Sequence, residues 1–117
     1  MDRNLALDFV RATEAAAISS ALWMGKGNEK AADQAAVEAM RKAFSAIEMD
    51  GTIVIGEGEK DEAAELYIGE TVGSGGEAVL DIAVDPLECT DSVANGRPNA
   101  LSVIATGAEG SLFHAPD

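Results

Sequence analysis

The first half of the chain places apolar residues three or four positions apart, which predicts two amphipathic helices. In the first helix the inward positions are Leu5, Phe9, Ala12, Ala16, Ser20 and Trp23. Gly25-Lys26-Gly27 should end that helix, and Asn28 can cap the second one. The apolar face of the second helix holds Ala36, Val37, Met40, Ala43, Phe44 and Ile47. We expect this helix to end near Asp50-Gly51.

The periodicity changes to that of strands in the second half of the chain. Thr52 to Ile55 is a β-branched run between two glycines, which favours a buried strand. Val79 to Val84 alternates and predicts a second strand. One face of it holds Leu80, Ile82 and Val84, and the other holds Asp81, Ala83 and Asp85. Pro86 should end the ladder of this strand because proline has no N–H to donate.

The remaining segments complete a mixed pattern. Apolar runs at Ala100 to Ala105 and near Leu112-Phe113 predict two more strands, whereas residues 62 to 70 fit either a short helix or a strand. Two helices followed by several strands predict an α+β or layered α/β fold, with residues 1–117 as one domain. The sheet looks unfinished where the sequence reaches His114 to Asp117. We therefore expect the N-terminal part of a longer domain.

Composition narrows the function classes. The 117 residues are 47% hydrophobic and 25% charged, which is typical of a folded domain, but the formal net charge is -13. Residues 51–117 carry most of the excess, with thirteen acids against two bases. Such a chain would repel nucleic acid and anionic membranes. The single Cys89, and an N-terminus without a signal-peptide pattern or a bilayer-spanning run, predict a cytoplasmic protein.

Some of these acids fall where simple solvation does not explain them. Asp33 is in phase with the apolar face of the second helix, so it should point inward, although a helix-start carboxylate satisfying free N–H groups is the alternative. Glu57 and Glu59 flank Gly58 after a buried strand. Extended geometry would aim both side chains to one side, and a solvated turn is the alternative there.

The strongest local signal is Asp85-Pro86-Leu87-Glu88-Cys89-Thr90. Asp85 ends a predicted strand, and after the turn at Pro86 the Glu88 carboxylate and the Leu87 carbonyl can converge on it. Hard oxygen ligands of this kind suit Mg²⁺ or Mn²⁺. The Thr90 hydroxyl would then be within reach of a bound water, as in the two-metal hydrolysis of phosphate esters. Bound cations would also let an acidic chain accept a sugar phosphate.

At these residues the sequence resembles the class II fructose-1,6-bisphosphatases of bacteria, in the superfamily of metal-dependent, lithium-sensitive sugar phosphatases. The resemblance covers essentially the whole chain, and its specific motifs are IVIGEGEKDEA, DPLECT, NALSVIA and HAPD. It implies a layered αβαβα fold and hydrolysis of the 1-phosphate of fructose 1,6-bisphosphate in gluconeogenesis. It also implies a homo-oligomer in the full-length protein.

Carried over by position, the resemblance makes four carboxylates ligands of Mn²⁺ or Mg²⁺: Asp33, Glu57, Asp85 and Glu88. Thr90 matches the threonine that orients or activates the attacking water, and Glu88 and Thr90 are also expected to contact the substrate. Glu59 is expected to support the site or the structure without binding metal. The lone His114 is expected to be structural.

The sequence also departs from the family pattern. Cys89 stands where the family usually has glycine, Asp91 adds a negative charge beside the phosphate site, and Glu29 stands near a position often held by lysine, with Lys30 as a substitute. Family members are considerably longer, and their C-terminal part supplies a further carboxylate and basic residues. We therefore expect weak metal binding and little turnover from these 117 residues alone.

Three alternatives to fructose 1,6-bisphosphate hydrolysis stay open at this stage. Related pockets could act on sedoheptulose 1,7-bisphosphate or, more distantly, on inositol phosphates. A third alternative, from another class, is a non-catalytic acidic fragment that binds cations or pairs with another chain through an exposed sheet edge.

Overall fold

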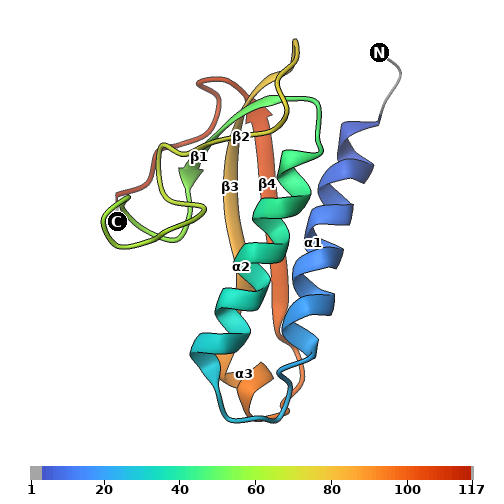
Figure 1. Cartoon of the computed structure of the whole chain (residues 1–117). Coiled ribbons are helices and arrows are strands. Elements are labelled where there is room, and N and C mark those ends of the chain that lie inside the picture. The colour runs from blue at the N-terminus through green and yellow to red at the C-terminus, as the bar shows by residue number, and fades with distance from the viewer. Residues whose placement is uncertain (1–3, 117) are drawn as a thin grey trace.

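The computed structural model describes residues 4–116 and shows two helices on one face of a four-stranded sheet (Figure 1). The helices α1 (Leu5–Ala21) and α2 (Glu29–Ser45) lie side by side, with α2 over β3 and α1 over β3 and β4. A short helix, α3 (Thr90–Ala94), follows the third strand. This arrangement confirms the predicted α+β fold class and gives the N-terminal part of a layered fold. None of the helices in the described range is both long and apolar enough to cross a membrane.

The sheet has the order β2-β1-β3-β4. Its strands are β1 (Asp50–Ile55), β2 (Thr71–Val72), β3 (Val79–Glu88) and β4 (Leu101–Ala108). The β1 and β3 strands run parallel, and the outer pairs β1–β2 and β3–β4 are antiparallel. A register shift between Ile53 and Ile55 inserts one extra residue into β1 just before that strand ends. Such a bulge redirects the chain that follows it.

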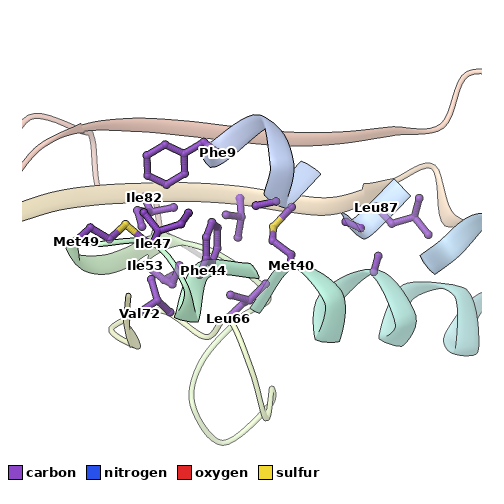
Figure 2. Close-up of a cluster of buried hydrophobic side chains, with 14 of the residues drawn as sticks. Phe9, Met40, Phe44, Ile47, Met49, Ile53, Leu66, Val72, Ile82 and Leu87 are labelled. Atoms are coloured by element: carbon purple, nitrogen blue, oxygen red, sulfur yellow. The ribbon is translucent and has the colours of Figure 1, made fainter. Parts of the chain in front are cut away.

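The predicted buried faces of the two helices and the residues at which they begin agree with the structure. The Asn28 side chain accepts a hydrogen bond from the Ala31 N–H at 3.0 Å, as expected of a capping residue. The helical residues buried against the sheet include Phe9, Met40 and Phe44, and the Phe9 and Phe44 rings meet edge to face at 6.2 Å (Figure 2). The predicted end of α2 was wrong, because the helix stops at Ser45 and Asp50 already belongs to β1.

Two strand predictions were also wrong. Pro86 does not end β3, which continues to Glu88. Only β4 pairs with this last part of the strand, and its register shifts between Asp85 and Glu88, so the missing N–H interrupts the ladder without ending it. Residues 112 and 113 form no strand, because the chain turns after β4 and the Gly110 N–H donates to Asp81 Oδ2 at 3.0 Å.

Residues 62–70 form neither a helix nor a strand but a sequence of turns. Leu66 is fully buried in the core and adopts a left-handed conformation with φ of 56° (Figure 2). A residue with a Cβ atom seldom takes this conformation unless its surroundings hold it there. Tertiary contacts therefore determine the path of this segment, which neither strand nor helix periodicity could indicate.

Candidate metal centre

Asp33 and Glu57 line the same cavity, which has a volume of about 430 Å³. Asp33 lies in the second turn of α2, half-buried, and shares the cavity wall with Val37. Glu57 follows β1 and is held by its own N–H, which donates to the Leu66 carbonyl at 2.9 Å. The inward direction predicted for Asp33 is thus confirmed, and Glu57 is half-buried where a solvated turn was the alternative.

Asp85 joins these two carboxylates from a third element. It lies on β3 beyond the last residue that pairs with β1, and it is exposed to solvent. Burial, followed by the negative charges of Asp33 and Asp85, raises the pKa of Glu57 to about 7. Burial and the Asp85 charge likewise raise the pKa of Asp33. Asp85 therefore lies near enough for its charge to act on both Asp33 and Glu57.

The last part of the predicted motif surrounds the end of β3. The Thr90 hydroxyl donates to the Leu87 carbonyl at 3.4 Å, which brings together two of the oxygens that the sequence indicated. Glu88 is exposed at the end of the strand, and Glu59 is exposed in the turn after β1. Cys89 has φ of 67°, so it occupies a left-handed position that favours glycine.

The cavity wall contains acids that the sequence analysis did not single out. Glu62 and Glu65 line it with Lys30, and Glu65 Oε2 is buried with no hydrogen-bond partner among the described residues. A buried oxygen of this kind is costly unless a partner satisfies it. Both residues belong to the segment of turns, where no periodicity indicates which side chains face inward. Only the number of acidic residues between positions 57 and 65 could have drawn attention to them.

The donor set fits a hard divalent cation in chemistry and in charge. Its ligands are carboxylate oxygens, which Mg²⁺ and Mn²⁺ prefer, and a cation would offset the repulsion that raises the pKa of Glu57. Within residues 4–116, however, no three Asp, Glu, His or Cys side chains are arranged so that they could hold a metal ion. The structure thus places Asp33 and Glu57 in one cavity, with Asp85 near enough for its charge to act on both, and leaves Glu88 exposed at the end of β3. These side chains do not form a closed coordination shell.

The pKa of Glu57 predicts how stability depends on pH in the metal-free protein. The folded state binds the Glu57 proton more tightly than the unfolded chain, whose pKa is near 4.5, so stability should fall as pH rises from 4.5 through 7. For a half-buried group, solvent screening reduces the loss to about 1–2 kcal/mol. Glu57→Gln should therefore be more stable than wild type at pH 8 by about that amount. Urea unfolding at pH 5 and pH 8 in the presence of a chelator measures the difference.

Glu59→Gln is the matched control for this measurement, because Glu59 lies two residues away and is exposed. It should keep the pH dependence of wild type. If the stability of Glu57→Gln falls with pH as steeply as that of wild type, Glu57 is not the group responsible.

Comparison with known proteins identifies the family of the chain. Residues 3–117 match the family described as bacterial fructose-1,6-bisphosphatase, glpX-encoded. The chain belongs to this family. Over its full length it is 53% identical to the Escherichia coli (strain K12) protein named fructose-1,6-bisphosphatase 1 class 2, and it spans 35% of that relative. The Haemophilus influenzae class 2 enzyme is 52% identical, also over 35% of its length.

Other relatives within this bisphosphatase family carry a double name. The Prochlorococcus marinus (strain MIT 9303) protein, 53% identical over the whole chain, is named D-fructose 1,6-bisphosphatase class 2/sedoheptulose 1,7-bisphosphatase. The chain spans 35% of that protein too. The family comparison therefore confirms the resemblance seen in the motifs, and the chain corresponds to about a third of these bisphosphatases.

Proposed function

We propose that this chain supplies the cation-binding part of a phosphatase that hydrolyses the 1-phosphate of fructose 1,6-bisphosphate, in the cytoplasm, as a step of gluconeogenesis. The observation that carries the proposal is that Asp33 on α2 and Glu57 after β1 line one cavity, with Asp85 on β3 near enough for its charge to act on both. Family membership suggests why acidic residues gather here. Sugar bisphosphates are anionic, and a cation bound by these carboxylates would attract their phosphate groups.

Four carboxylates would hold the cation in this proposal: Asp33, Glu57, Asp85 and Glu88. The ligand type suits Mn²⁺ or Mg²⁺. When bound, such a cation supplies positive charge to the phosphate group and makes a water more acidic. The repulsion between Glu57 and its neighbours favours binding of the cation, because the bound charge removes an existing cost.

Thr90 would orient the attacking water. Its hydroxyl hydrogen is donated to the Leu87 carbonyl, so the lone pairs of Oγ1 remain free to accept a hydrogen bond from a water O–H. A water held in this way turns its own lone pair toward phosphorus. Its attack forms the new P–O bond while the bond to the sugar oxygen breaks, and a proton passes to that oxygen as phosphate leaves.

The double name of some relatives supports a second substrate. We propose sedoheptulose 1,7-bisphosphate as the alternative, since the Prochlorococcus marinus relative is named for both bisphosphatase activities. Both sugars present a phosphate ester to the same groups, so these carboxylates and Thr90 would serve either one. Homo-oligomeric assembly of the full-length protein stays a prediction from the family resemblance.

The test is release of inorganic phosphate from fructose 1,6-bisphosphate by the complete gene product, with and without Mn²⁺. We expect release only with the metal, and Thr90→Ala should lower kcat by about 100-fold or more while the Kd for Mn²⁺ stays within about threefold. Thr90→Ser keeps the hydroxyl and should retain most of the turnover. A Thr90→Ala variant that loses Mn²⁺ affinity and keeps its turnover with saturating metal would make Thr90 a ligand instead.

A further inference from the structure

Glu70 is a buried acid outside the cavity whose carboxylate makes two well-defined contacts. The residue is 9% exposed and precedes β2. Its Oε1 accepts the Leu66 N–H at 2.7 Å, and its Oε2 accepts from Arg41 Nε at 3.2 Å. Arg41 lies on α2, where its Nη1 also donates to Ser45 Oγ at 2.8 Å. Because a buried carboxylate without a partner is strongly disfavoured, these contacts fix where Glu70 can lie.

Leu66 connects this carboxylate to Glu57. Its N–H points to Glu70 and its carbonyl accepts the Glu57 N–H at 2.9 Å. Both directions depend on the left-handed conformation of Leu66, with φ of 56°. A return of Leu66 to an ordinary conformation would turn at least one of these two groups away. The Glu70 carboxylate therefore fixes the turn at Leu66, and the Leu66 carbonyl in turn fixes the backbone of Glu57.

Backbone hydrogen bonds keep the rest of this segment in register. The Ile68 N–H donates to the Gly58 carbonyl at 2.9 Å, and the Ile53 N–H donates to the Glu70 carbonyl at 2.9 Å. The chain on either side of Leu66 thus runs beside the end of β1. The side chain of Glu70 joins this segment by a hydrogen bond to α2, the helix that also carries Asp33.

We propose that Glu70 is a positioning residue for Glu57. Together with Arg41, it ties the segment that holds Glu57 to the helix that carries Asp33, and so sets the separation of the two carboxylates across the cavity. The inference rests on the proposed function, because it takes Glu57 and Asp33 as ligands of one cation site. Glu70 itself does not line that cavity.

Two measurements on the complete gene product test this role. The first is hydrogen exchange of residues 55–58 without metal, and the second is the Kd for Mn²⁺. Glu70→Ala should speed exchange of the Glu57 amide at least tenfold and raise the Kd for Mn²⁺ by about 10–100-fold, the range found when a residue that supports a metal ligand is removed. Glu70→Gln keeps an oxygen for the Leu66 N–H but loses the contact with Arg41, so its Kd should rise by only about 3–10-fold.

Asp81→Asn is the matched control, because Asp81 is also buried but contacts Gly110 and His114 instead of the turn at Leu66. It should lower stability without changing the Kd for Mn²⁺ or the exchange at Glu57. If Glu70→Ala does not fold, Arg41→Gln is measured in its place, and its Kd for Mn²⁺ should rise by about 3–10-fold. Unchanged exchange in the folded variant overturns the proposal.

The Glu57→Gln variant separates this proposal from the proposed function. If Glu57→Gln weakens Mn²⁺ binding and Glu70→Ala does not, the positioning role is wrong and the cation site stands. If neither variant weakens binding, Glu57 is not a ligand and both assignments fall. If both weaken it and Asp81→Asn does not, the positioning role is supported.

Discussion

Asp85→Ala and Glu88→Ala should each lower Mn²⁺-dependent phosphate release by about 100-fold or more in the complete gene product. Loss of a direct ligand should cost at least as much as the 10–100-fold loss found for residues that only support ligands. Both side chains are exposed, so their removal should change the free energy of unfolding by no more than about 0.5 kcal/mol. Phosphate release and urea unfolding, measured on the same preparations, distinguish a loss of chemistry from a loss of structure.

Glu77→Ala is the matched control for these two variants. Glu77 is an exposed acid just before β3, so its replacement removes the same charge at a similar exposure. It should leave phosphate release and stability near the wild-type values. Retained activity in both Asp85→Ala and Glu88→Ala would remove these residues from the proposed cation site.

Gly56→Ala should lower the free energy of unfolding by about 2–4 kcal/mol. A Cβ at position 56 would overlap the Leu66 carbonyl oxygen and lie 2.6 Å from Ile53 Cγ2. The Leu66 carbonyl cannot move away without breaking its hydrogen bond to the Glu57 N–H. Urea unfolding at pH 6 measures the loss, and Mn²⁺ titration of the folded fraction should show a higher Kd.

Gly51→Ala, inside β1, provides the comparison for Gly56, which directly follows that strand. A Cβ at position 51 would meet the terminal Cδ1 of Ile82 at 2.7 Å, which is the flexible end of a side chain and can shift. We expect this variant to lose less stability than Gly56→Ala and to keep its affinity for Mn²⁺. Equal losses in the two variants would show that crowding alone, without displacement of Leu66, accounts for the effect.

The parts of the fold that depend on local periodicity could be predicted from the sequence. The buried face of α2 and the cap at Asn28 both follow from residues close together in the chain. The register shift that lets β3 continue past Pro86 depends instead on β4, which follows more than ten residues later. No local signal around Pro86 reports the presence of that partner.

The segment from residue 56 to residue 70 shows the same limit more strongly. Its path depends on the contact of Arg41 with Glu70, which are 29 positions apart in the sequence, and on the left-handed conformation of the buried Leu66. Propensity for helix or strand says nothing about either feature. The undecided prediction for residues 62–70 therefore reflects a segment whose conformation is determined by tertiary contacts.

The candidate site was predicted from two kinds of signal. Hard oxygens at Asp85, Leu87 and Glu88 indicated a cation from the residues alone, whereas the inclusion of Asp33 and Glu57 depended on the family resemblance. The structure supports the grouping of Asp33, Glu57 and Asp85 through their charges. It adds Glu65, which lines the same cavity, has one buried oxygen, and was indicated by no motif.

The left-handed Cys89 also makes the proposed site chemically addressable. It is the only cysteine in the sequence, it is exposed, and it lies next to Thr90. Within residues 1–117, a maleimide or a spin label would therefore attach at one defined place, one residue from the hydroxyl assigned to the attacking water. Cys89 thus provides a built-in attachment point for probes of cation and substrate binding.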